Sequence, residues 1–283
     1  MGKVELETPD CPLCGQPDGK VLYSGGRFAP YGVNRCLHCG MSYLSPRPTE
    51  HAMLELYQQD RYFSGVTEEG YGDYAAQEPA LRATFRRLLQ TLAARRLTGG
   101  KLLEIGCGYG YLLDEARLYF DLRVGTDFSD GAIKQAQPRA NQVYKGGIDS
   151  VPESAQFDFI IATHVIEHVY HPQAFLRALI LRLRPGGYLL IAAPDMGSFW
   201  RIIMGRYWPS FKLPEHVLYF DRHTLSNLLH SCGIRQISHV PYPHAFPLPL
   251  IASKFGISIE PTLNRYSLWL PATTIAFVGV KGT

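Results

Sequence analysis

Residues 102–113 read LLEIGCGYGYLL, an apolar run that breaks into three alternating glycines and then continues in a helix-like pattern. In an open parallel sheet, ligands bind beyond the carboxyl ends of the strands, most often at the first strand-to-helix turn. Gly106, Gly108 and Gly110 remove side chains from such a turn, so a ligand can lie against backbone N–H groups at the start of a helix. The stretch therefore predicts a strand, a ligand-binding turn and a helix.

The chain from Lys101 onward alternates between patterns of buried strands and patterns of helices. KLLEIG, LRVGTDFS, QVYKGG, FDFIIATH and YLLIAAP read as strands, and GYLLDEARLYF, DGAIKQAQ, HPQAFLRALILRL and NLLHSCG read as helices. This alternation predicts an α/β fold whose parallel sheet is covered by helices on both faces. The last two strands, RQISHV and TTIAFVGVKG, have no obvious helix between them, so they could pair antiparallel.

The composition is that of an ordinary globular protein, with 283 residues of which 46% are hydrophobic and 19% are charged. This length accommodates one large domain and a small one. The 28 Lys and Arg against 25 Asp and Glu give a net charge of +3, which is too weak to indicate nucleic acid or a membrane surface as a partner. We see neither a signal-peptide pattern nor a run of about 20 apolar residues, so we expect a cytoplasmic protein.

Two acidic residues accompany the glycine turn: Glu104 lies in the strand before it and Asp127 ends the next strand. An acid about 20 residues beyond such a turn can accept hydrogen bonds from both hydroxyls of a ribose. The pattern E-x-G-x-G-x-G resembles the class I S-adenosylmethionine-dependent methyltransferases, whereas nicotinamide-dependent reductases, the alternative, prefer G-x-G-x-x-G. FDFIIATHVIEHV, LRPGGYLLIAAPD and EHVLYFDRHTLSNLLHSCGI are similar to further motifs of that family. The resemblance covers about residues 101–281 and implies a Rossmann-like α/β fold with a doubly wound, mostly parallel seven-stranded sheet.

The resemblance also implies which residues bind S-adenosylmethionine. Glu104 would hold the ammonium group of the cofactor, directly or through water, and Asp127 would accept the ribose hydroxyls. Phe128 would pack on the adenine ring. Gly147 stands where the family often has an adenine-contacting Asp, so the backbone of Gly147 and Ile148 would take that role. The expected cofactor-binding residues are Glu104, Gly106, Cys107, Gly108, Gly110, Asp127, Phe128, Gly147, Ile148, His164, Tyr71 and Tyr74.

Two histidines are candidates for a general base, because an oxygen or carbon acceptor must lose a proton and histidine titrates near neutral pH. His168 follows the fourth strand in HVIEHVYHP, and His216 lies in an aromatic segment inserted after the fifth strand. Each also has a structural interpretation, in which His168 braces its loop and His216 fixes the chain. The aromatic residues of 196–222 either form a cap over the substrate pocket or a satellite core.

Four of the six cysteines form the units CPLCG and CLHCG, which contain Cys11, Cys14, Cys36 and Cys39. Four thiolates at this spacing are typical of a closed, structural zinc site, with four free thiols as the alternative. We therefore expect a zinc ribbon over residues 1–48. A helical, tyrosine-rich segment that covers the cofactor should follow over 49–98, and the S-adenosylmethionine-binding domain over 99–283.

These features predict an enzyme that transfers a methyl group from S-adenosylmethionine to O, N or C of a small molecule. A zinc ribbon fused to this core resembles the sugar and natural-product methyltransferases, so a glycosyl or natural-product substrate is included. One alternative is an rRNA or tRNA methyltransferase that grips RNA with the ribbon and the arginines of 82–96. The weak net charge and the scarcity of aromatics among those arginines disfavour nucleic acid. The other alternative is a catalytically silent scaffold that binds the cofactor.

Overall fold

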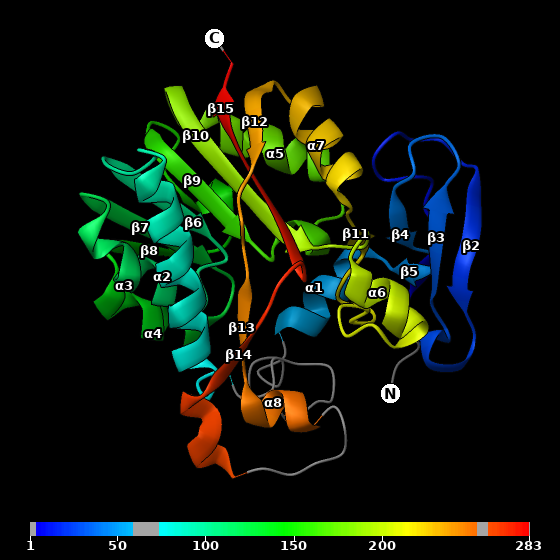
Figure 1. Cartoon of the computed structure of the whole chain (residues 1–283). Helices are drawn as coiled ribbons and strands as arrows, with labels where there is room; N and C mark the ends of the chain where they lie inside the picture. Colours follow the sequence, from blue (N-terminus) through cyan, green and yellow to red (C-terminus); the bar gives the residue numbers. More distant parts are fainter. Residues whose placement is uncertain (1–3, 59–73, 254–259, 283) are drawn as a thin grey trace.

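The computed structural model of the protein describes residues 4–58, 74–253 and 260–282. Its centre is a seven-stranded sheet in the order β12-β15-β10-β9-β6-β7-β8, and β15 runs antiparallel to both of its neighbours (Figure 1). This confirms the α/β fold, the mostly parallel seven-stranded sheet and the antiparallel pairing of the last two predicted strands. The strands are β6 (Lys101–Ile105), β7 (Leu122–Asp127), β8 (Gln142–Lys145), β9 (Phe157–Thr163), β10 (Leu183–Pro194), β12 (Ile234–His239) and β15 (Thr274–Lys281).

Successive residues of a strand contribute to different hydrophobic cores, one on each face of the sheet. In β6, Leu102 packs with residues of α2 and α3, whereas Leu103 packs on the other face with residues of α5 and α7. Side chains of a strand point alternately to either face, so the continuous apolar runs of the sequence are buried on both sides. The helices are α2 (Glu78–Ala94), α3 (Tyr111–Glu115), α4 (Asp130–Ala136), α5 (Pro172–Leu181) and α7 (Arg222–Ser231).

The helix ends follow local chemistry. Asp221 caps α7, because its carboxylate accepts from the N–H of Thr224 at 2.8 Å while the Thr224 hydroxyl accepts from the N–H of Asp221 at 2.9 Å. The helix predicted over GYLLDEARLYF is shorter than expected, since α3 ends at Glu115 and a 3-10 turn follows. There the chain turns back toward β7, and the N–H of Asp121 donates to the carbonyl of Gly100.

None of the helices in the described segments has the length and apolar character of a membrane span.

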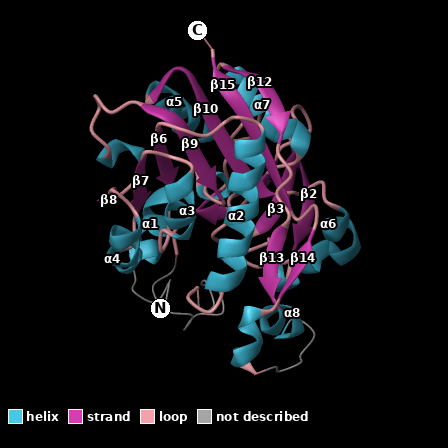
Figure 2. Ribbon diagram, turned by 60° about the vertical axis from the view of Figure 1, so that its left-hand side comes forward, coloured by secondary structure: helices cyan, strands magenta, loops and turns pink. Residues whose placement is uncertain are grey.

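The segment between β12 and β15 contains elements that the sequence analysis did not anticipate. These are β13 (His244–Pro247), α8 (Leu248–Ser253) and β14 (Ser267–Leu270). Strand β13 pairs with β14 and lies along α2, where the N–H of Ala245 donates to Oγ1 of Thr84 at 2.9 Å (Figure 2). The expectation of no helix between the last two strands was wrong, because α8 is only six residues long and its proline-containing sequence shows no clear period.

The N-terminal ribbon forms a four-stranded antiparallel sheet in the order β11-β4-β3-β2, beside α6 in Figure 1. Its edge strand β11 comes from the segment after β10, so main-chain hydrogen bonds join the ribbon to the rest of the chain. The N–H of Leu44 donates to the carbonyl of Val217 at 2.9 Å, and the N–H of Val217 donates to the carbonyl of Glu167 at 2.9 Å. The elements are β1 (Leu6–Glu7), β2 (Gly19–Ser24), β3 (Gly32–Cys36), β4 (Ser42–Leu44), β5 (Arg47–Pro48), α1 (Glu50–Gln58), α6 (Phe199–Met204) and β11 (Leu218–Tyr219).

Several large aromatics of residues 196–222 are buried against the ribbon. Phe211 is 1% exposed, and its ring contacts those of Tyr23, Phe28, Trp208 and Tyr219 at centroid distances of 5.1 to 5.4 Å. Residues from both ends of the chain therefore share one hydrophobic core. Phe211, Trp208 and Tyr219 thus pack in a hydrophobic core, and the cap over a substrate pocket stays a prediction.

Candidate functional site

The candidate site lies where the strand order reverses. From β6 the chain proceeds to β7 and β8 on one side, and β9 and β10 lie on the other side of β6. The carboxyl ends of β6 and β9 are therefore the switch point at which open α/β sheets bind ligands. The glycine turn follows β6, and a 3-10 turn at Ile166–His168 follows β9. The sequence motifs thus meet at one edge of the sheet.

The backbone of the glycine turn has conformations that residues with a side chain rarely adopt. Gly106 and Gly108 have φ values of 68° and 51°, in the left-handed region. A Cβ at Gly106 would lie 2.7 Å from Cγ2 of Val165, and a Cβ at Gly108 would lie 2.8 Å from the hydroxyl oxygen of Tyr74. Gly110, with φ of 76°, precedes the first residue of α3. Glycine is thus required here by conformation and by close neighbours, and the backbone N–H groups stay uncovered by a Cβ.

Two buried carboxylates stand beside this turn. Glu104 is 2% exposed, and its Oε2 has no hydrogen-bond partner among the described residues. Burial, and then the neighbouring Asp127, raise the pKa of Glu104 well above its usual value. Asp127 accepts hydrogen bonds from the N–H groups of Gly108 and Ser129, each at 2.9 Å, and burial raises its pKa as well. A buried, unpaired carboxylate oxygen is costly, so this arrangement fits an ammonium group from a ligand.

The residues expected around adenine follow β7 and β8. Phe128 is 67% exposed, and a Cβ at Gly147 would lie 3.5 Å from its ring, so the backbone of Gly147 faces this aromatic side chain. Ile148 is buried at the start of the next turn. Tyr74 lies over the glycine turn, stacked on Tyr111 at a centroid distance of 5.6 Å. Tyr71 lies outside the described residues.

Cys107 fills space beneath the turn. Its side chain is 3% exposed, and a Cβ at Gly125 would lie 2.8 Å from its sulfur. Burial raises the pKa of the Cys107 thiol far above its usual value, with the Glu104 and Asp127 charges adding to the effect. The thiol therefore stays protonated, as a small packing residue requires.

His164 directly follows β9 with φ of 57°, and its own N–H donates to the carbonyl of Ala192. Its Nδ1 lies 3.3 Å from Oε1 of Glu167, and its Nε2 is buried with no hydrogen-bond partner in the described part of the chain. Edge-on contacts join its ring to those of Tyr242 and His244, at 6.2 and 5.8 Å. An imidazole oriented by a carboxylate can accept a proton at its other nitrogen.

Sequence reasoning missed Tyr242 and His244, whose rings contact that of His164. Tyr242 lies just before β13, and His244 is the first residue of this strand. Burial lowers the pKa of His244 to about 3, and the nearby His164 adds to the shift. His244 also stacks on Phe246 at a centroid distance of 4.5 Å. No spacing in PYPHAFP marks a site; only a histidine among prolines and aromatics could have drawn attention to it.

The two predicted bases, His168 and His216, lie together. Their rings are 4.7 Å apart between centroids and nearly perpendicular, at 87°. Nδ1 of His168 lies 3.1 Å from the carbonyl of Glu215, and Nδ1 of His216 lies 2.9 Å from the carbonyl of Ser210. Burial lowers the pKa of both imidazoles; the charge of Glu167 partly opposes the shift of His168, whereas the neighbouring His168 adds to the shift of His216. The structure thus brings two neutral imidazoles side by side next to Glu167.

The four predicted zinc ligands also converge. The sulfur atoms of Cys11 and Cys39 are 3.5 Å apart, as are those of Cys14 and Cys36, and all four lie within 4.8 Å of one another. Zinc–sulfur bonds of about 2.3 Å in a tetrahedron place sulfurs about 3.8 Å apart, so this donor set fits Zn²⁺. His38 lies outside the set and contacts Asp18 at 3.2 Å.

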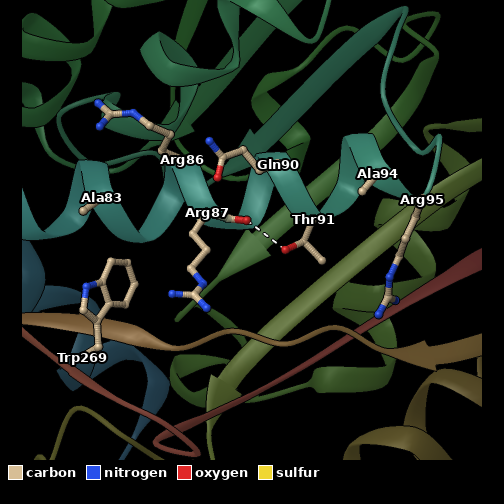
Figure 3. A pocket seen from close by; sticks show the side chains of 8 residues that line it. All are labelled: Ala83, Arg86, Arg87, Gln90, Thr91, Ala94, Arg95 and Trp269. Carbon is tan, nitrogen blue, oxygen red and sulfur yellow. Dashed lines mark hydrogen bonds between the residues drawn. The ribbon is translucent and has the colours of Figure 1, made fainter.

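A separate groove of about 700 Å³ runs along α2 and does not include the glycine turn (Figure 3). Its arginines are largely engaged within the protein. Arg86 points away from Arg87 in Figure 3 and pairs with Glu115 at 3.1 Å, while Arg95 donates to the carbonyl of His239. The lining residues are Ala83, Arg86, Arg87, Gln90, Thr91, Ala94, Arg95 and Trp269.

Comparison with known proteins assigns the family. Residues 75–239, more than half of the chain, match the methyltransferase domain family. A protein of Mycolicibacterium smegmatis named a probable S-adenosylmethionine-dependent methyltransferase is 26% identical over 205 residues, which cover 71% of this chain and 73% of that protein. The ubiquinone biosynthesis O-methyltransferase of Parvibaculum lavamentivorans is 36% identical over 113 residues, which cover 37% of this chain and 44% of that protein.

Solved structures agree on the fold. Magnesium protoporphyrin IX methyltransferase from Synechocystis, solved with bound SAH, superposes with a TM-score of 0.55 at 14% identity, over 82% of this chain and all of that chain. An SAM-dependent methyltransferase from Thermotoga maritima gives a TM-score of 0.53 at 18% identity, over 72% of this chain and 91% of that chain. The chain therefore belongs to the methyltransferase domain family, and its fold is that of the class I S-adenosylmethionine-dependent methyltransferases.

Proposed function

We propose that the protein transfers the methyl group of S-adenosylmethionine to a small-molecule acceptor. The observation that carries this proposal is the unpartnered Oε2 of the buried Glu104 beside the glycine turn. This oxygen would bind the ammonium of the cofactor. Asp127 would bind the ribose hydroxyls with the acceptor capacity that its two backbone hydrogen bonds leave. Phe128 and the backbone at Gly147 would hold the adenine ring, and Tyr74 would cover the cofactor from above the turn.

For the acceptor we favour oxygen over nitrogen and carbon. Relatives in this family include ubiquinone biosynthesis O-methyltransferases, such as those of Parvibaculum lavamentivorans and Cereibacter sphaeroides, the latter 33% identical over 153 residues. A hydroxyl must lose its proton as the methyl group arrives, and Nε2 of His164, oriented through Nδ1 by Glu167, suits that step. Holding acceptor and methyl group in line would supply much of the remaining rate enhancement.

The RNA alternative receives little support. Arg82 is bound by Glu78, Asp114 and Glu115 at 2.7 to 3.0 Å, so a residue expected to grip phosphates is occupied inside the protein. A second of these arginines, Arg86, pairs with Glu115 as well. A silent scaffold would have no need for the half-buried His164 that the buried Glu167 orients.

We further propose that Zn²⁺ occupies the cysteine cluster, which consists of Cys11, Cys14, Cys36 and Cys39. Four thiolate ligands leave no open coordination position, so the metal would be structural. It would hold the two turns of the ribbon, whose sheet shares the hydrophobic core with the catalytic part of the chain.

Calorimetric titration with S-adenosylmethionine tests the proposal. We expect the wild type to bind the cofactor and Glu104→Gln to bind it about 10- to 100-fold more weakly, because one charge-assisted hydrogen bond is lost. Glu153→Gln, at an exposed glutamate, is the matched control and should bind normally. No heat with S-adenosylmethionine alongside tight binding of NAD would refute the assignment. His164→Gln should retain cofactor affinity and lose methyl transfer to a pool of small-molecule acceptors, measured with tritiated cofactor.

A further inference from the structure

Glu167, His168 and His216, which we name the histidine cluster, converge beyond the carboxyl end of β9. One potential ligand atom from each side chain lies within 4.8 Å of the other two. Glu167 and His168 come from the 3-10 turn after β9, whereas His216 comes from the segment just before β11. The fold therefore brings a carboxylate and two imidazoles from distant parts of the sequence to one point.

The two imidazoles have the hydrogen-bond pattern of metal ligands. Each Nδ1 lies within 3.1 Å of a backbone carbonyl, that of Glu215 for His168 and that of Ser210 for His216. A carbonyl oxygen can only accept, so each Nδ1 carries the hydrogen and each Nε2 carries the lone pair. Metal-bound histidines are held in the same way, with the second ring nitrogen donating to a carbonyl or carboxylate that fixes the ring.

The carboxylate of Glu167 gives a second, independent indication that this cluster suits a cation. Glu167 is 1% exposed; its Oε1 lies 3.3 Å from Nδ1 of His164, and its Oε2 is buried without a hydrogen-bond partner in the described segments. A buried carboxylate oxygen left without a partner is strongly unfavourable, and a bound cation would satisfy it. Among the described residues, His164 and the cationic Lys212 act electrostatically on both histidines, and Lys212 is the permanently charged one; its charge adds to the lowering of both pKa values. If its ammonium alone compensates Glu167, no metal binds.

We propose that the histidine cluster binds one divalent transition-metal ion through Nε2 of His168, Nε2 of His216 and a carboxylate oxygen of Glu167. Two imidazoles and one carboxylate suit Mn²⁺, Fe²⁺, Co²⁺ or Zn²⁺. Three protein ligands leave coordination positions open, unlike the cysteine cluster. An acceptor oxygen bound at an open position would lose its proton more readily. This last role rests on the proposed function; metal binding does not.

Titration of the full chain with Mn²⁺ tests the site. The protein is first given one equivalent of Zn²⁺, which four thiolates bind in preference to two imidazoles and a carboxylate, so that the cysteine cluster is filled and the histidine cluster stays open to Mn²⁺. Free Mn²⁺ is then followed by its electron paramagnetic resonance signal. We expect one bound equivalent in the wild type, and a loss of affinity of about tenfold or more in His216→Gln and in Glu167→Gln. His171→Gln, at an exposed histidine, is the control and should bind Mn²⁺ as the wild type does.

Two further measurements make the result decisive. Thermal unfolding and calorimetric binding of S-adenosylmethionine identify any variant that has lost its fold, and His168→Gln then serves as the second ligand variant. Absence of bound Mn²⁺ in the wild type, or unchanged Mn²⁺ affinity in folded ligand variants, overturns the proposal. Since the titration needs no methyl transfer, a failed metal site and a failed methyltransferase assignment give different results.

Discussion

The cysteine cluster and the histidine cluster are both sets of metal-type ligands, but the chain builds them differently. Each pair of cysteines lies in one tight turn, with a hydrogen bond from the N–H of Gly15 to the carbonyl of Cys11 in the first turn and from Gly40 to Cys36 in the second. The histidine cluster instead needs the sheet, the turn after β9 and the segment before β11 to be in place. Local spacing thus predicts the closed, structural zinc site, whereas the proposed open site becomes apparent only after folding.

The largest effect should follow from removing a ligand of the cysteine cluster. We expect Cys36→Ser to lose its zinc and to lower the free energy of unfolding by more than about 3 kcal/mol, since metal binding and ribbon folding are coupled. Cys232→Ser changes a half-buried cysteine outside the cluster and should retain zinc. Metal analysis and urea unfolding give both quantities. A Cys36→Ser protein as stable as the wild type would mean that the cluster contributes nothing structural.

The next effect concerns the buried aromatic side chains that pack against the ribbon. Phe211→Ala removes a fully buried ring that packs against Tyr23 and Phe28 of the ribbon and should reduce the free energy of unfolding by about 3–5 kcal/mol. Tyr207→Ala, four residues earlier and 68% exposed, should change it by less than about 0.5 kcal/mol. Urea unfolding of both variants measures the contrast. Equal stability of the two variants would show that the buried ring of Phe211 contributes no more to folding than the exposed ring of Tyr207.

A smaller effect concerns pH and the histidines beside the cluster. Burial lowers the pKa of His244 from 6.5 to about 3, so the folded protein disfavours a proton that the unfolded chain accepts. The stability from neutral His244 is therefore complete above pH 6.5 and is lost progressively as the pH falls toward 3. Stability of His244→Gln should depend less steeply on pH in this window than that of the wild type. His230→Gln, at an exposed histidine, should keep the wild-type slope in the same denaturation series.

The sequence was sufficient to predict the strands, turns and motifs that depend on residues close together in the chain. Alternating apolar patterns identified the seven strands, and the glycine spacing located the turn between β6 and α3, because both depend on residues a few positions apart. The strands β13 and β14 were missed, since their pairing depends on a distant partner and on contact with α2. His244 was missed for the same reason. His168 and His216 were singled out separately, and only the folded chain shows that they share Glu167 as a neighbour.

The hydrogen bonds between the ribbon and the rest of the chain determine where the protein can be shortened. The carbonyl of Val217 accepts a hydrogen bond from the N–H of Leu44 in β4, and its N–H donates to the carbonyl of Glu167, so the backbone of Val217 links the ribbon to the turn after β9. A shortened chain starting near residue 75, where the family match begins, would lose β4 and uncover Phe211 and Trp208. Such a fragment would expose an apolar surface and an unpaired strand edge, and we expect it to aggregate during expression although it retains Glu104, the glycine turn and Asp127.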